Sequence, residues 1–263
     1  MTLPAGEIHV WLAFDELLSQ AESVREFTAL LEPGEIDRMG RLHLERRRHQ
    51  FLVTRALQRT VLADYLHAAP RELRFLAGEH GKPSLAAPFA ADGLHFNIAH
   101  SRGLVALAVG RAETLGVDVE YMKARTAPLA LASRYFTAAE AGALSELPVA
   151  EQQRRFYALW TLKESWLKAT GRGLAAGLAN VSFDLDARHQ ATGVIVSNEP
   201  ASGWRFWQAS PTPEHGLALA LRLDGAGGRE LEPVVRLRAW RDPQAREFTV
   251  RPMNSGQEQR AQT

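Results

Sequence analysis

The strongest constraint on the fold of this chain is a weak internal repeat. The segment "LLEPGEIDRM" (30–39) aligns with "YFTAAEAGAL" (135–144), and "FLVTRALQRTVL" (51–62) aligns with "FYALWTLKESWL" (156–167). Both alignments need the same offset of 105 residues. One offset found at two separate places is harder to obtain by chance than either match alone. The sequence therefore predicts two copies of one structural unit.

The predicted elements follow the same order in both halves. Each half begins with a strand-like stretch, at 7–14 and at 115–122, and continues with a short helix and a longer helix that carries an apolar stripe. The second short helix opens with a capping box, in which Thr137 is the N-cap and Glu140 lies three residues later. Further strands are predicted at 94–100, 104–110, 181–185, 204–210, 217–223 and 234–240.

These elements predict an α+β protein made of two pseudo-symmetric α/β subdomains, with the active-site cleft between them. We expect an N-terminal subdomain at 1–113, a C-terminal subdomain at 114–240 and a loose polar tail at 241–263. The hydrophobic content of 46% and charged content of 23% are typical of a soluble globular protein.

Composition excludes several classes of function. The chain has no cysteine, so it has no disulfide, no thiolate metal site and no cysteine nucleophile. A net charge of +1 gives no general signature of nucleic-acid binding. No apolar run reaches the roughly 18 residues of a membrane span, and the first residues do not resemble a signal peptide. We therefore expect a cytoplasmic protein without nucleic-acid or membrane partners.

Two carboxylates mark the strand "LGVDVEYM" (115–122). Side chains alternate along a strand, so Asp118 and Glu120 lie side by side on one face. A solvated strand face is the commoner explanation of such a pair taken alone. As a functional pair, it favours Mg²⁺, which takes one or two carboxylates and completes its shell with water and substrate phosphates. Glu164 is the candidate for a third ligand.

The helix that contains "WTLKESWLK" (160–168) supplies further charges. Glu164 and Lys168 are four residues apart and are therefore neighbours on the helix surface, which is also the spacing of an ordinary ion pair. Lys163 falls within the apolar arc, where a charge is costly unless it is paired or reaches water. Two readings stay open for Lys163: it reaches the cleft, or it pairs with an acid that the pattern does not identify.

Several basic groups suit a ligand with more than one phosphate. Lys82 precedes Pro83 in a predicted turn, and His100, Ser101 and Arg102 lie between two predicted strands. Three arginines recur every seven residues and are expected along one stripe of a helix: Arg41, Arg48 and Arg55. The chain has no P-loop and no G-x-G-x-x-G sequence, which gives a nucleoside-triphosphatase or Rossmann reading no support.

Taken together, these motifs resemble a known family. "LGVDVE", followed 39 residues later by "LWTLKESWLK", resembles the two-part signature of the 4′-phosphopantetheinyl transferase superfamily, and "GKP" and "FNIAHS" resemble its other blocks. The length and the doubled organisation resemble the longer, Sfp-type branch, in which one chain holds both halves of the fold. This resemblance implies transfer of the phosphopantetheine arm of coenzyme A (CoA) to a serine of an apo acyl or peptidyl carrier protein, with release of 3′,5′-ADP.

The resemblance also implies roles for individual residues. Asp118, Glu120 and Glu164 would bind Mg²⁺, and Glu164 would be the base. Lys168 would neutralise or protonate the departing phosphate. On the CoA side, His100 would contact the 3′-phosphate or ribose, with Lys82, Pro83, Ser101 and Arg55 nearby. Arg41, Arg48 and Arg102 are looser assignments. Apart from the resemblance, the position of Lys163 in the apolar arc makes it a candidate second cation beside the metal, ranked below Lys168.

One position departs from the family pattern: Ala99 stands where many members have serine.

Two rival functions remain, a non-catalytic protein that binds CoA or a carrier, and an Mg²⁺-dependent nucleotide hydrolase. The stretch 171–183 is expected to help form the carrier docking surface. A doubled chain supplies both sides of the cleft, so we expect a monomer. Whether the carrier serves fatty-acid, polyketide or peptide synthesis stays open.

Overall fold

The computed structural model describes residues 1–18, 20–78, 80–122, 128–173, 177–197, 200–223, 232–242, 248 and 250–253. The N-terminal half contains β1 (Glu7–Phe14), α1 (Ala21–Thr28), α2 (Pro33–Gly40), α3 (Glu45–Leu66), β2 (Phe75–Ala77), β3 (Pro83–Leu85), β4 (His95–Ser101) and β5 (Leu104–Gly110). The C-terminal half contains β6 (Leu115–Tyr121), α4 (Pro128–Tyr135), α5 (Ala138–Ser145), α6 (Val149–Thr170), β7 (Val181–Leu185), β8 (Ala191–Val196), β9 (Trp204–Thr212) and β10 (His215–Arg222). Two more strands follow, β11 (Val234–Ala239) and β12 (Arg251–Pro252).

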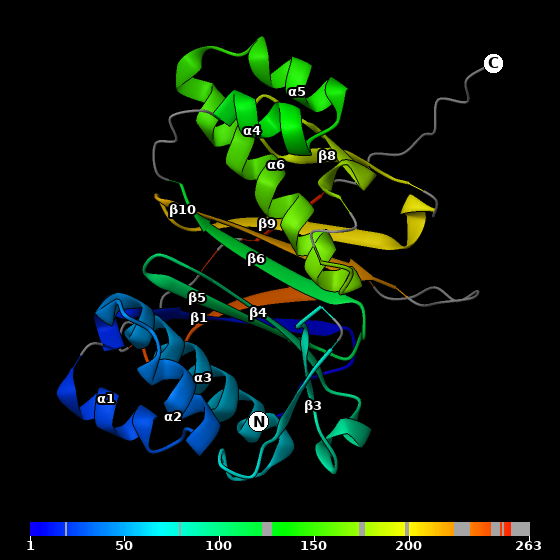
Figure 1. The fold of residues 1–263 in the computed structure, drawn as a ribbon. Coiled ribbons are helices and arrows are strands. Elements are labelled where there is room, and N and C mark those ends of the chain that lie inside the picture. Colours follow the sequence, from blue (N-terminus) through cyan, green and yellow to red (C-terminus); the bar gives the residue numbers. More distant parts are fainter. Residues whose placement is uncertain are drawn as a thin grey trace.

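The elements stack in four layers (Figure 1). One four-stranded sheet has the order β11-β1-β5-β4, and the other has the order β12-β9-β10-β6. Helices α1–α3 cover the outer face of the first sheet, and α4–α6 cover the second. A core of aliphatic side chains fills the space between the sheets, including Val10, Leu12, Ala106, Val117 and Leu219. This arrangement confirms the α+β prediction.

The internal repeat predicted from the sequence corresponds to the two helical layers. α2 and α5 begin at Pro33 and Ala138, 105 residues apart, and α3 and α6 each have 22 residues. The capping box at Thr137 is confirmed, because its hydroxyl accepts the backbone N–H of Glu140. α2 begins with an equivalent box, in which Glu32 takes the N-cap position.

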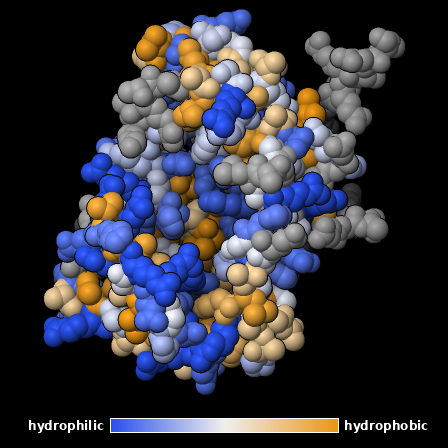
Figure 2. All heavy atoms as spheres, viewed as in Figure 1, coloured by the Kyte–Doolittle hydropathy of each residue, from blue (hydrophilic) through white to orange (hydrophobic). Residues whose placement is uncertain are grey.

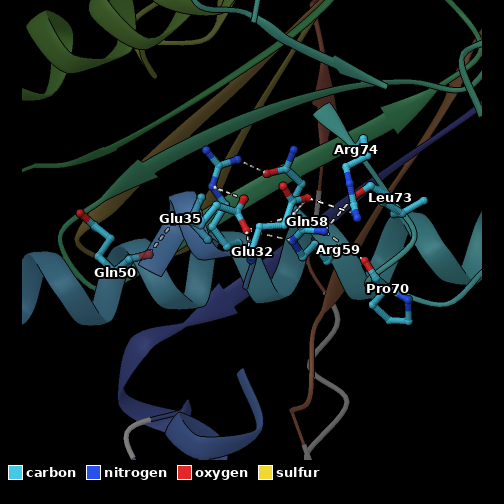
Figure 3. Close-up of polar contacts among 10 residues, drawn as sticks. Glu32, Glu35, Gln50, Gln58, Arg59, Pro70, Leu73 and Arg74 are labelled. Carbon is cyan, nitrogen blue, oxygen red and sulfur yellow. Dashed lines mark hydrogen bonds and ion pairs between the residues drawn. The ribbon is translucent and has the colours of Figure 1, made fainter. Parts of the chain in front are cut away.

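Each half also buries a cation against the glutamate of its capping box. In the N-terminal half Arg59 is fully buried, and its Nη2 lies 2.7 Å from Glu32 Oε1 and 2.9 Å from Glu35 Oε2 (Figure 3). Its Nη1 donates to the carbonyl of Leu73 at 2.9 Å and to that of Pro70 at 3.2 Å. A buried charge is tolerated only when it is paired and hydrogen-bonded in this way, so Arg59 fixes α2 on α3.

The C-terminal strands differ from the predicted boundaries. β11 lies within the predicted C-terminal subdomain, but it pairs in parallel with β1 of the N-terminal half. Arg236 of β11 donates two hydrogen bonds to Glu7 of β1, of 2.8 and 3.0 Å. β12 lies within the predicted tail and pairs with β9. Both strands cover sheet edges whose backbone groups would otherwise be unpaired, which periodicity alone does not reveal. None of the helices in the described part of the chain is long and apolar enough to cross a membrane.

Candidate active site

The centre of the site depends on a very close contact between α6 and β6. A Cβ added at Gly116 would lie 2.1 Å from the carbonyl oxygen of Ser165 and 2.3 Å from the amide nitrogen of Ala169. Only glycine allows the helix backbone to approach the strand so closely. The residues that precede these two contacts, Glu164 and Lys168, are therefore held beside the strand that carries Asp118.

Asp118 and Lys168 form the best-defined polar contact of the site. Lys168 Nζ lies 2.6 Å from Asp118 Oδ1, and Asp118 is only 4% exposed. The second oxygen, Asp118 Oδ2, is buried and has no hydrogen-bond partner among the described residues. Buried acceptors are normally satisfied. This oxygen is therefore available to a group that the protein alone does not supply.

Glu164 shares the same electrostatic environment. Burial raises the pKa of its carboxyl group, the negative charge of Asp118 raises this pKa further, and Lys168 lowers it. Glu120 is half-buried and lies two residues after Asp118 on the same face of β6, opposite Gly216 of β10. Three carboxylates therefore belong to this region. No group of three or more His, Asp or Glu side chains already converges as a metal site within the described ranges.

His100 approaches the site from β4. Two side chains of β4 join it to β6: Asn97 Oδ1 accepts the backbone N–H of Val117 at 2.9 Å, and Ser101 Oγ accepts that of Tyr121 at 2.7 Å. His100 is exposed to solvent, yet desolvation by the surrounding protein lowers its pKa, Lys168 lowers this pKa further and Asp118 raises it. The imidazole is thus within electrostatic range of the Asp118–Lys168 pair.

Lys82 links the two halves at the far end of α6. Its Nζ donates to the carbonyl of Ala169 at 2.9 Å and to that of Glu113 at 3.3 Å, and burial lowers its pKa. Lys82 also lines a cavity of about 420 Å³ together with Pro83 and Gly171. Figure 2 shows hydrophilic residues around the hollow between the two helical layers. A polar site with several cations that spans two structural units suits an anionic ligand.

Comparison with known proteins identifies the family to which a chain with this site belongs. Residues 114–221 match the model of the 4′-phosphopantetheinyl transferase superfamily, and residues 19–112 match the model described as 4′-phosphopantetheinyl transferase, N-terminal. The 4′-phosphopantetheinyl transferase HetI of Nostoc sp. is 35% identical over 176 residues, covering 66% of this chain and 73% of the relative. The chain belongs to the 4′-phosphopantetheinyl transferase superfamily.

Other relatives in this superfamily agree. The 4′-phosphopantetheinyl transferase Sfp of Bacillus subtilis is 33% identical over 171 residues, covering 65% of this chain and 73% of that protein. A phosphopantetheinyl transferase of Thraustochytrium sp. is 28% identical over 209 residues, covering 75% and 72%. The resemblance inferred from the motifs is confirmed, and the protein is an enzyme of the 4′-phosphopantetheinyl transferase class.

Lys163 does not reach the cleft. It is fully buried, its Nζ lies 2.7 Å from Glu140 Oε2, and it donates to the carbonyls of Leu178, at 3.0 Å, and Val181. The prediction that Lys163 is a second cation at the ligand site is therefore wrong. The alternative prediction, that Lys163 pairs with an acid, is confirmed, and that acid is Glu140. Lys163 is the counterpart of Arg59 and holds the segment after α6; residues 174–176 of that segment lie outside the described residues.

The three arginines do not share one helix. α3 begins at Glu45, and Arg41 is the C-cap of α2, so the predicted single stripe is wrong. Arg41 and Arg48 are exposed. The Nε of Arg55 lies 3.3 Å from Glu35 Oε1, and its Nη1 donates to Gln58 at 2.8 Å. Their contacts lie within the N-terminal half. Arg102 stacks on the Tyr121 ring at 5.3 Å.

Two important residues were missed by sequence reasoning. Gly116 was treated only as one position of an alternating strand, although a glycine in a strand interior often marks a close backbone approach. Asn97 is 3% exposed and lies between the apolar residues Phe96 and Ile98 of β4, and a buried amide in such a place needs a specific partner. Ala99 is buried between the sheets, and the nearby hydroxyl of Ser101 already accepts the amide of Tyr121.

Proposed function

We propose that this enzyme moves the phosphopantetheine arm of CoA to a serine of an apo acyl or peptidyl carrier protein and depends on Mg²⁺. The observation that carries the proposal is the buried Asp118 carboxylate, which is paired with Lys168 through one oxygen and has no hydrogen-bond partner at the other within the described ranges. The desolvated Glu164 beside it supplies a second carboxylate. This combination suits a cation and a phosphate ligand bound together.

The donor set fits Mg²⁺. Hard divalent cations take carboxylate oxygens, and Mg²⁺ commonly uses one or two of them together with water and substrate phosphates. Asp118, Glu120 and Glu164 would hold it, and Asp118 Oδ2, which has no hydrogen-bond partner in the described part of the chain, is an oxygen open to a cation. When bound, Mg²⁺ supplies neutralisation of the charge on the pyrophosphate.

The protein side chains perform the remaining tasks. The carrier serine oxygen attacks the phosphorus that bears the pantetheine arm, and the bond from that phosphorus to the bridging pyrophosphate oxygen breaks. Glu164, whose carboxyl group lies within electrostatic range of Asp118 and Lys168, accepts the serine proton. Lys168 stabilises the charge on the departing 3′,5′-ADP. We assign the 3′-phosphate or ribose side of CoA to His100 and Lys82.

Incubation with CoA, Mg²⁺ and a panel of apo carrier proteins tests this function. The expected result is a mass gain of one phosphopantetheine on at least one carrier, together with release of 3′,5′-ADP. Phosphate or nucleotide release without any carrier would indicate a hydrolase instead. CoA binding without a modified carrier would indicate a binding protein. The panel also ranks fatty-acid, polyketide and peptide carriers.

We also infer that the enzyme acts as a monomer in the cytoplasm. The support for a monomer is that one chain contributes both β4 and β6 to the site, joined through Asn97 and Ser101. The lack of cysteine is compatible with a reducing compartment. Light scattering after size-exclusion chromatography measures the mass in solution, and activity confined to dimers would contradict the monomer.

A further inference from the structure

A second cavity, of about 660 Å³, lies in the C-terminal half and shares no lining residue with the cavity at Lys82. Its walls come from α6, the turn between β7 and β8, and the β9–β10 hairpin. Its charged lining side chains are Arg154, Arg188 and Arg251, with no carboxylate among the described lining residues. All three arginines are exposed, and none forms an ion pair with another described residue.

This basic cavity adjoins the proposed reaction centre. Gly216 lines it and is paired with Glu120 across the β6–β10 ladder. Thr161 lines it from α6, three residues before Glu164, which corresponds to about 4.5 Å along a helix axis. The cavity at Lys82 instead touches Gly171, just beyond the C-terminal end of α6. The site therefore has a cavity at each end, with Glu164 between them.

The wall that presents Arg188 is rigid before any ligand binds. Asp186 Oδ1 accepts the backbone N–H groups of Arg188 and Gln190, each at 2.8 Å. Gln208 of β9 donates to the carbonyl of His189 at 3.2 Å and accepts the amide of Ala191 at 2.8 Å. A turn fixed by four such bonds loses little conformational freedom when a partner docks.

We propose that this basic cavity docks an acidic surface of the carrier protein, next to the serine that is modified. This inference rests on the proposed function. The pantetheine arm of CoA is uncharged and would bring no counter-charge to the three arginines, of which Arg188 lies in electrostatic range of the Asp186 carboxylate of the same turn. Carboxylates on a protein surface match them, because arginine binds carboxylate in a planar, two-bond geometry. The cavity lies beside Glu164 on the side away from Lys82, so the acceptor approaches from there.

The test measures KM for CoA and KM for the carrier separately, using the apo carrier that the wild-type enzyme modifies. Arg154→Glu and Arg188→Glu are each expected to raise KM for the carrier roughly five- to tenfold, with KM for CoA unchanged. The wild-type kcat/KM for the carrier falls as salt increases, and this fall is smaller in the variants. Arg71→Glu is the matched control, because Arg71 is exposed in the N-terminal half and lines neither cavity.

The outcomes separate this inference from the proposed function. If the wild-type protein modifies no carrier, the proposed function is wrong, and the inference of a carrier docking site is wrong as well. A wild-type enzyme that modifies a carrier, with both variants retaining wild-type KM values, overturns the docking site alone. A rise in KM for CoA rather than for the carrier shows that the cavity receives the pantetheine arm, which also overturns the inference.

Discussion

Lys168 donates a 2.6 Å hydrogen bond to Asp118, a residue 50 positions earlier in the chain, and so joins α6 to β6 at the centre of the site. The lysine keeps 30% of its side chain exposed, whereas the aspartate is almost fully buried. The pair therefore has one end fixed in the protein and one end open to the cleft. This asymmetry suits a lysine that binds a phosphate, because the Lys168 ammonium stays accessible to a ligand while the Asp118 carboxylate fixes its position.

Lys168→Ala should lower kcat by roughly 10²-fold or more, while changing KM for CoA much less. The physical reason is that the charge on the leaving phosphate develops during the reaction and is largest in the transition state. Steady-state kinetics with CoA and the apo carrier measure both constants, and circular dichroism checks the fold. A variant with weaker CoA binding and unchanged kcat would contradict the leaving-group role.

Glu164→Gln should remove most turnover and at the same time make the ligand-free protein more stable near neutral pH. Burial and Asp118 raise the pKa of Glu164, so the folded state pays to ionise this carboxyl group. A raised carboxyl pKa contributes stability that is present below the unfolded value and is lost as pH rises through the folded value. The variant's higher Tm at neutral pH should therefore approach that of the wild type toward about pH 4. Full transfer activity in a folded Glu164→Gln enzyme would sink the role of base.

Activity should also fall in acid as Glu164 takes up its proton. The raised pKa of Glu164 belongs to the metal-free protein, and a bound divalent cation should lower this pKa because it favours the ionised carboxylate. The acid limb of the kcat/KM profile should therefore move to lower pH as the Mg²⁺ concentration rises, and pH–rate series at limiting and at saturating Mg²⁺ measure this movement. An acid limb that stays at the same pH at both concentrations would mean that another group is the base.

Gly116→Ala should destabilise the protein by about 2–4 kcal/mol, because the new methyl group meets the backbone of α6, which cannot move aside without losing its contact with β6. Gly142→Ala is the matched control. Nothing lies within 4 Å of a Cβ at Gly142, which is exposed inside α5, so alanine there should add roughly 0.5–1 kcal/mol. Urea unfolding measures both changes. Equal stabilities for the two variants would refute the close-contact argument.

Lys163→Met should lower stability by about 3–5 kcal/mol, since it leaves Glu140 buried without its cation. The double variant Lys163→Met/Glu140→Gln should lose less than the sum of the single variants. Burial lowers the pKa of Lys163 and Glu140 opposes this shift, as expected for a structural pair. KM for CoA in the folded fraction should be unchanged. A selective rise in KM for CoA would mean that Lys163 contributes to CoA binding and would contradict its purely structural role.

The sequence by itself determined the repeated unit, the capping box at Thr137 and the alternation that places Asp118 and Glu120 on one face. The repeat follows from comparing the chain with itself, whereas the capping box and the alternation depend on cap chemistry and local periodicity, which neighbouring residues encode. The same local reasoning identified Glu164 and Lys168 as neighbours on a helix, and the motif spacing identified the family.

Only the tertiary structure decided which charges meet. A helical wheel placed Lys163 among apolar residues but could not reveal Glu140, which approaches from another helix. Arg55 pairs with Glu35 of another helix, a partner that the seven-residue spacing of the arginines could not reveal. β11 belongs to the sheet of β1 because it covers that strand's open edge, a long-range choice that no local pattern records. Local periodicity fixes the face on which a side chain lies, whereas its partner depends on how distant elements pack.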